Sequence, residues 1–202
     1  DFENSAGVPI DAIVFGGRRS TTTPLVYESF NWQHGTYLGA TMTSEKTAAA
    51  AGKVGELRHD PMAMLPFCGY HMADYWQHWL DMGKRGGEKM PRVFHVNWFR
   101  KDSEGKFVWP GFGDNMHVLK WIVERCEGKG EAHETPIGYL PDPATMQIDN
   151  LGLDPNDVEL LFSVDAEEWQ EEVEAQTDYF KMFGEKLPEG IRAELEALKS
   201  RL

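Results

Sequence analysis

The sequence predicts a single α/β unit that ends in a helical tail. Two runs of branched and aromatic residues predict β-strands, at 8–17 and 92–99. Apolar residues at helical spacing predict helices between and after these strands, most clearly at 69–87. From about Asp165 two acidic helices are expected to close the chain. The 202 residues contain no internal repeat and no low-complexity linker, so these elements indicate one α/β domain.

The N-terminal half is predicted as strand, helix, loop and helix. The strand at 8–17 ends on two glycines, which let the backbone turn sharply after it. Residues 23–42 then predict a helix with Pro24 at its start. The alanine-rich segment 44–60 has no apolar face and predicts a loop between two well-patterned segments. The helix at 69–87 follows and ends on a second glycine pair.

The C-terminal half is predicted as strand, helix, extended segment and two further helices. After the strand at 92–99, residues 114–128 predict a helix capped by Asp114 or Asn115. The residues of this helix that are predicted to face inward are Leu119, Ile122, Val123 and Cys126. Residues 135–141 predict a short strand. The first of the two final helices is predicted to be anchored by Trp169, Val173 and Phe180.

Composition excludes several classes of partner. The net charge is −13 and the isoelectric point is about 4.9, so the surface repels nucleic acid and anionic membranes. No apolar run approaches the roughly 20 residues of a membrane span, and no signal-like segment opens the chain. Cys68 and Cys126 have no metal-ligand spacing and are predicted to be reduced thiols. A cytoplasmic protein with no nucleic-acid or membrane partner is expected.

Common catalytic motifs are missing from the sequence. Four Gly-Lys pairs occur, but none has the upstream glycine and the following Ser or Thr of a phosphate-binding P-loop. The seven histidines form no metal-binding pattern, and His71 and His78 on one helix face favour an ordinary surface or core role. There is no GxSxG elbow and no context for a cysteine nucleophile. No metal site is predicted in this chain.

Two arginines follow the first predicted strand. Arg18 and Arg19 come directly after the glycine pair, where ligands bind at the carboxyl ends of strands in open α/β sheets. Paired guanidinium groups suit bidentate contact with phosphate oxygens. Surface arginines paired with acidic side chains are an equally good interpretation of these two residues alone.

The loop predicted at 44–60 also has two interpretations. Taken alone, an ordinary disordered surface loop is favoured. An active-site lid is the alternative, because long loops without structure inside compact domains are often functional.

An aromatic stretch begins at the end of the second predicted strand, which leads into it. Its rings are separated by turn residues and fit neither strand nor helix spacing: Trp98, Phe99, Phe107, Trp109 and Phe112. Asn115 stands at its end, and an amide carries both an acceptor and donors, so it can match a purine edge. The stretch therefore indicates a purine pocket, with a small satellite core under a turn as the alternative.

Five motifs in order identify a family resemblance. They are "VPIDAIVFGGRR", "PLVYESFNWQHG", "DPMAMLPFCGY", "VNWFRKD" and "GKFVWPGFGDN". Together they resemble the C-terminal part of GTP-dependent phosphoenolpyruvate carboxykinase, from about Gly7 to the final helices. The resemblance implies a mixed-sheet nucleotide-binding domain of that type with C-terminal helices. Residues 1–164 are expected to hold the guanine pocket and lid, and 165–202 the helical tail of the same domain.

The resemblance implies roles for individual residues. Arg18 is expected to be the catalytic residue of this chain and to contact the nucleotide phosphates. The residues implied to bind GTP are Arg18, Trp98, Phe99, Phe107, Phe112, Gly113, Asp114 and Asn115. The residues implied to form the family's Ω-loop lid are Ser44, Glu45, Lys46, Thr47, Ala48, Ala49, Ala50, Ala51, Gly52 and Lys53. ATP-using relatives lack the aromatic run, so GTP or ITP is favoured over ATP.

The resemblance also implies an activity that needs more than this chain. In that family the enzyme interconverts oxaloacetate and GTP with phosphoenolpyruvate, CO2 and GDP, a lyase step of gluconeogenesis. The P-loop, the ligands of Mn2+ and the oxaloacetate-binding arginines lie upstream of such a segment, and Mg2+ accompanies the nucleotide. The chain is therefore expected to be an inactive piece whose partner is the missing N-terminal part, monomeric when complete.

Alternatives of other classes remain at this point. One is a stand-alone purine-binding or regulatory module without catalysis. Another is a purely structural domain, which measurable GTP binding would exclude.

Overall fold

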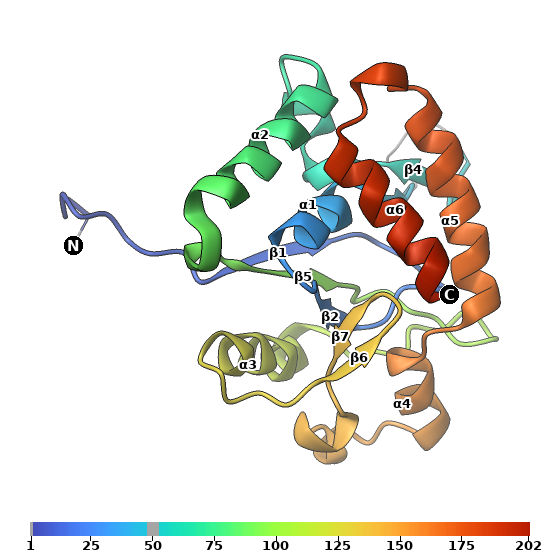
Figure 1. Ribbon diagram of the computed structural model, residues 1–202. Coiled ribbons are helices and arrows are strands. Elements are labelled where there is room, and N and C mark those ends of the chain that lie inside the picture. Colours follow the sequence, from blue (N-terminus) through green and yellow to red (C-terminus); the bar gives the residue numbers. More distant parts are fainter. Residues whose placement is uncertain (1, 48–52) are drawn as a thin grey trace.

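The protein is built around a five-stranded mixed sheet with helices on both faces (Figure 1). The computed structural model describes residues 2–47 and 53–202. In the order in which they pair, the strands are β1 (Ala12–Gly16), β5 (Arg92–Val96), β2 (Val26–Glu28), β7 (Gly138–Leu140) and β6 (His133–Thr135). Strands β1 and β5 run parallel, and every other pair in this sheet is antiparallel. The predicted α/β class with a mixed sheet is confirmed.

The two faces of the sheet carry different helices. The upper layer in Figure 1 contains α1 (Trp32–Ala40), α2 (Met72–Gly86), α5 (Ala166–Lys181) and α6 (Glu189–Arg201). The lower layer contains α3 (Asn115–Cys126) and α4 (Pro155–Phe162). Each layer buries its own apolar cluster, centred on Trp76 above and on Trp121 below. The predicted anchors of α5 are confirmed, because Trp169, Val173 and Phe180 are all buried in the upper cluster.

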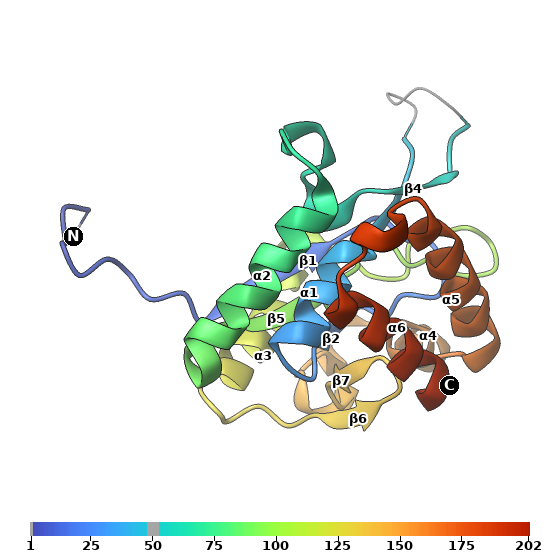
Figure 2. The same cartoon turned by 45° about the horizontal axis from the view of Figure 1, so that its top comes forward.

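Short connections complete the chain. Single 3₁₀ turns lie at Pro61–Ala63, Leu65–Phe67, Gly87–Lys89, Phe112–Asp114, Pro143–Thr145, Asp149–Leu151 and Gly184–Lys186. The N-terminal residues form an arm that leaves the body in both views (Figures 1 and 2).

The predicted helix at 23–42 is wrong in its first half. Val26–Glu28 forms β2, which pairs with β5 on one side and β7 on the other. The helix begins only at Trp32, where the Asn31 side chain accepts a hydrogen bond of 2.9 Å from the His34 amide. Pro24 therefore precedes a strand. Pairing on both sides outweighed the helix-like spacing of the apolar residues.

The predicted inward face of α3 is only partly right. Ile122 is buried as predicted, but its buried neighbours are Val118 and Trp121. Leu119 and Val123 are 40% and 55% exposed. Val118 and Trp121 therefore define an inward face that is rotated from the predicted one. Trp121 packs against Phe94 of the sheet, with the two ring centres 5.8 Å apart.

The predicted loop at 44–60 is framed by two strands. β3 (Thr43–Glu45) and β4 (Leu57–His59) form an antiparallel pair outside the main sheet, and β4 is visible beside α5 and α6 in Figure 2. Lys46 and Glu56 extend the pair with an ion pair of 2.8 Å. Five predicted lid residues, at positions 48–52, lie outside the described residues.

Gly17, directly after β1, packs closely against the backbone of β3. A Cβ atom at Gly17 would lie 2.2 Å from the carbonyl oxygen of Thr43. Gly17→Ala is therefore expected to destabilise the protein by about 1–3 kcal/mol, because backbone must move to admit the methyl group. Gly69→Ala is the matched control, since its Cβ would meet nothing within 4 Å. Equal thermal unfolding temperatures for the two variants would contradict this expectation.

Candidate functional site

Two loops meet at the carboxyl ends of the parallel strands. Gly16, the last residue of β1, is in register with Val96, the last residue of β5. The chain segments that follow, with Arg18 in one and Phe99 in the other, therefore leave the sheet side by side. This edge is where open α/β sheets bind ligands.

A buried asparagine joins these two loops. The amide oxygen of Asn97 accepts hydrogen bonds from the backbone N–H of Arg19 at 3.2 Å and of Phe99 at 3.1 Å. Its amide nitrogen donates to the carbonyl oxygens of Arg19 and Thr23, both at 2.9 Å. Asn97 is fully buried, so its three bonds to Arg19 and Thr23 fix the two loops relative to one another, while the bond from Phe99 orders its own loop.

Arg18 lies over the first ring of the aromatic stretch. Its guanidinium carbon is 4.5 Å from the centre of the Phe99 ring, which is a cation–π contact. An open cleft of about 190 Å³ lies beside this pair, lined by Gly16, Gly17, Arg18, Ser44, Val96, Trp98 and Phe99. The structure thus brings together Arg18, two predicted aromatic residues and one predicted lid residue.

The aromatic stretch continues the site beyond Phe99. Phe107 meets Phe99 edge to face at a ring separation of 5.9 Å, and Lys101 lies 5.1 Å from the centre of the Phe107 ring. The turn between them is closed by Asp102, which accepts from the backbone N–H groups of Glu104 and Lys106 at 2.9 Å each. Phe107 is 51% exposed, so its ring is open to a ligand.

Phe112 is presented to solvent from a strained turn. Its side chain is 98% exposed, and its φ of 50° is unusual for a residue with a side chain. Gly111 before it also has a positive φ, of 75°. Gly113 and Asp114 complete the 3₁₀ turn that leads into α3. An exposed ring on a strained backbone is a feature of ligand sites.

Asn115 is oriented by a neighbouring tryptophan. The Nε1–H of buried Trp109 donates to the Oδ1 atom of Asn115 at 2.8 Å. With its oxygen engaged, the N–H groups of the Asn115 amide are the part left to donate to another acceptor. Trp109 therefore has a structural role beneath the site, whereas half-buried Trp98 borders the cleft and also packs against the lower core.

The strand pair β3–β4 is tied to the loop that carries Arg18. The Arg18 backbone N–H donates to Oγ of Ser44 at 3.2 Å, and its carbonyl oxygen accepts from the Glu45 N–H at 2.8 Å. Glu45 also accepts from the Ser20 N–H at 2.6 Å. The described end of the predicted lid is thus in direct contact with the predicted phosphate-binding loop.

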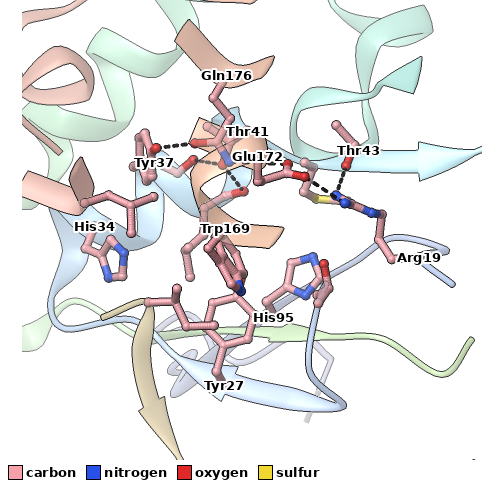
Figure 3. Close-up of a pocket in the computed structure, with 15 residues that line it drawn as sticks. Arg19, Tyr27, His34, Tyr37, Thr41, Thr43, His95, Trp169, Glu172 and Gln176 are labelled. Carbon is pink, nitrogen blue, oxygen red and sulfur yellow. Dashed lines mark hydrogen bonds and ion pairs between the residues drawn. The ribbon is translucent and has the colours of Figure 1, made fainter. Parts of the chain in front are cut away.

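Sequence reasoning missed a buried polar cluster behind Arg18. It surrounds a cavity of about 30 Å³ between the sheet, α1 and α5, and the side chains of Arg19, Glu172, Gln176 and His95 turn toward it (Figure 3). Burial lowers the pKa of His95 to about 3, so its ring is neutral at pH 7. Members such as Arg19 and Glu172 lie 153 positions apart, and no local pattern signals their contact.

Neither a metal-binding group nor a membrane-spanning helix is found among the described residues. Among residues 2–47 and 53–202, no group of three or more His, Cys, Asp or Glu side chains could hold a metal ion. None of the helices in the described part of the chain has the length and apolar character that a membrane crossing needs.

Comparisons with known proteins agree on one family. Residues 1–201 match the family described as "Phosphoenolpyruvate carboxykinase C-terminal P-loop domain". Proteins named "Phosphoenolpyruvate carboxykinase [GTP]" from Corynebacterium kroppenstedtii and Chlamydia pneumoniae are each 52% identical over 203 residues, and the one from Renibacterium salmoninarum is 49% identical. These matches cover 100% of this chain and 33–34% of the relatives. The chain therefore spans about a third of the length of the curated relatives it matches.

Proposed function

The chain belongs to the GTP-dependent phosphoenolpyruvate carboxykinase family, and from this premise we propose that it supplies the guanine-nucleotide site of such an enzyme. The complete enzyme would convert oxaloacetate and GTP into phosphoenolpyruvate, GDP and CO2. The observation that carries the proposal is the contact of Arg18 with Phe99, whose ring in turn meets the half-exposed ring of Phe107. The Arg18 guanidinium suits a phosphate and the phenylalanine rings suit a flat base, and both follow the carboxyl ends of β1 and β5.

The base would lie among the rings of the aromatic stretch. Phe99 and Phe107 are already in contact, and Phe112 is free to cover a base because nothing else holds its ring. Base–aromatic stacking contributes about 1–3 kcal/mol per base in single-strand nucleic-acid binders, the scale used here. Trp98, Gly113 and Asp114 would complete the border of this pocket.

Asn115 would select guanine. Because its oxygen accepts from Trp109, its N–H groups are the part that faces a ligand. Guanine carries the acceptor O6 where adenine carries the N6 amino donor, so a donating amide favours guanine. The family name of the relatives agrees with this chemistry.

Arg18 would act on the phosphates. A guanidinium group can bind two phosphate oxygens at once, and it stays charged throughout the reaction. Its contact with Phe99 is a cation–π contact, which does not use the oxygen-binding capacity of the guanidinium N–H groups. Arg18 would thereby orient the transferred phosphoryl group and stabilise its developing negative charge.

Residues 44–53 would form the lid. Its first strand is bonded directly to the Arg18 loop, so lid closure and phosphate binding share a backbone connection. Ordering a loop costs about 1–2 kcal/mol per backbone residue, which contacts in the filled site must offset. Closure over substrate and nucleotide would exclude water from the reaction.

The remaining requirements would be met outside this chain. The described residues offer no ligand set for Mn2+, so its ligands, the P-loop and the oxaloacetate-binding arginines would belong to the other two thirds of the enzyme. Mg2+ would accompany the nucleotide. We expect the complete enzyme to be cytoplasmic and monomeric, and the present chain alone to form no phosphoenolpyruvate.

Substitution of Asn115 and Trp109 in the full-length enzyme tests the proposed site. Asn115→Ala is expected to weaken GTP binding by about 1–3 kcal/mol, the cost of an unpaired edge contact. Trp109→Phe is expected to reduce the preference for GTP over ATP, because the freed amide can rotate and offer its oxygen to adenine. An abasic triphosphate is the matched control ligand, and its affinity should not change. Equal losses for GTP and the abasic triphosphate would contradict the assignment.

A further inference from the structure

Arg19 enters the interior of the protein, whereas Arg18 lines the open cleft. Its side chain is 6% exposed, and its guanidinium group enters the buried cluster of Figure 3. The Nη2 atom donates to Oε2 of Glu172 at 2.7 Å, and Nη1 donates to Oγ1 of Thr43 at 2.6 Å. One buried side chain therefore joins the phosphate-binding loop, helix α5 and the first strand of the lid.

The backbone of Arg19 is fixed as firmly as its side chain. Asn97 accepts from its N–H and donates to its carbonyl oxygen, and the same amide oxygen accepts from the N–H of Phe99. The position of Arg19 thus determines where the preceding residue, Arg18, stands relative to the Phe99 ring.

Glu172 is held in place by the core. It projects from α5, and its side chain is 10% exposed. Trp169 and Val173 beside it are buried in the upper cluster, and Gln176 donates to Oε1 of Glu172 at 3.4 Å. Gln176 in turn accepts a hydrogen bond from the hydroxyl of Tyr37. A carboxylate anchored in this way can direct its partner.

A second contact joins α5 to the other side of the site. Arg100, which follows Phe99, is 3% exposed, and its Nη2 atom lies 3.9 Å from Oε2 of Glu168. Glu168 precedes Glu172 by one helical turn, so both acidic residues lie on the same face of α5. The phosphate-binding loop and the aromatic stretch each have one arginine directed at this helix.

We propose that Glu172 is a positioning residue of the nucleotide site, which acts through Arg19 to hold Arg18 over Phe99 and to hold the lid strand at Thr43. This inference rests on the proposed function. A buried ion pair contributes little stability relative to apolar packing of the same volume, so stability alone does not account for this one. Its geometry instead fixes the direction of a group that must meet a phosphate.

The inference separates phosphoryl transfer from base binding. If Arg19 loses its anchor at Glu172, Arg18 moves relative to the phosphates, while Phe107, Phe112 and Asn115 keep their places in the base pocket because neither Arg19 nor Glu172 bonds to them. A displacement of about 1 Å in a reacting geometry can lower a rate by roughly a hundredfold. The turnover number should therefore fall while the affinity for guanosine stays unchanged.

A double-mutant cycle in the full-length enzyme tests the inference. Glu172→Gln is combined with Arg18→Ala, and the turnover number is measured for each variant. Glu172→Gln alone is expected to lower the turnover number by about tenfold to a hundredfold. In the Arg18→Ala background, Glu172→Gln should lower the turnover number by less than about twofold, because the side chain that Glu172 positions is no longer present. Glu171→Gln, at an exposed position on the same helix, is the matched control.

The outcomes separate this inference from the proposed function. Additive losses, or no loss in Glu172→Gln, would overturn the inference alone. Unchanged turnover in Arg18→Ala would overturn the proposed function and the inference together. If Glu172→Gln melts at a temperature too low for assay, the pair Arg19→Met and Glu172→Met replaces it, because apolar residues of similar size preserve packing. The two Met substitutions are expected to show the same coupling to Arg18→Ala, and a lack of this coupling would overturn the inference.

Discussion

Arg18→Lys in the full-length enzyme is expected to lower the turnover number by roughly a hundredfold, the scale found when one charge-stabilising donor is removed from an active site. Lysine keeps the charge but loses the planar fork that binds two phosphate oxygens. It also loses most of the face-on contact with Phe99, where the guanidinium carbon lies 4.5 Å from the ring centre. The affinity for guanosine, which has no phosphate, should not change.

The control for this substitution is Arg85→Lys. Arg85 is exposed in the last turn of α2, which leads to the amino end of β5, whereas the site lies at the carboxyl end of that strand. It should retain the turnover number of the unmodified enzyme. Full turnover in Arg18→Lys would show that Arg18 is an ordinary surface arginine and would remove the phosphate-binding part of the account.

Phe112→Ala is expected to weaken GDP binding by about 1–3 kcal/mol, or roughly 5- to 150-fold. The ring is 98% exposed in this structure, so its removal takes nothing from either core. The free energy of unfolding should therefore stay the same while the nucleotide affinity falls. Quenching of the fluorescence of nearby Trp98 and Trp109 by GDP provides the binding measurement.

The control for Phe112→Ala is another exposed phenylalanine. Phe67 is 82% exposed in a different 3₁₀ turn, and Phe67→Ala should leave GDP affinity unchanged. Equal affinities for the Phe112 and Phe67 variants would show that Phe112 does not cover the base.

The strands that form the site could be predicted from the sequence. The runs that become β1 and β5 are apolar, and a glycine follows the first run while aromatic residues close the second. That pattern places Arg18 just beyond the first strand, but it puts Phe99 inside the second, which in the structure already ends at Val96. It does not show that β1 and β5 are neighbours, because pairing of distant strands depends on the whole sheet.

The features that local patterns failed to predict depend on tertiary contacts. Val26–Glu28 became a strand because β5 and β7 pair with it from both sides. The ends of the predicted loop at 44–60 became β3 and β4, although the segment has no apolar face. Polar strands of this kind are held by backbone hydrogen bonds, which leave little trace in composition.

The orientation of functional side chains was also beyond the sequence. Asn115 could be predicted to meet a base, but the hydrogen bond from Trp109 that turns its amide is visible only in the structure. The adjacent Arg18 and Arg19 look equivalent in the sequence. In the structure Arg18 lines the cleft, whereas Arg19 lies in the interior because it pairs with Glu172, a residue near the C-terminal end of the chain.

A crystal structure of the full-length enzyme with bound GDP would show where the base lies. Guanine is expected among the rings of Phe99, Phe107 and Phe112, with its O6 atom within hydrogen-bond distance of the Asn115 amide nitrogen. The phosphates should extend toward Arg18. A base bound away from these rings, with Phe112 still fully exposed, would contradict the account.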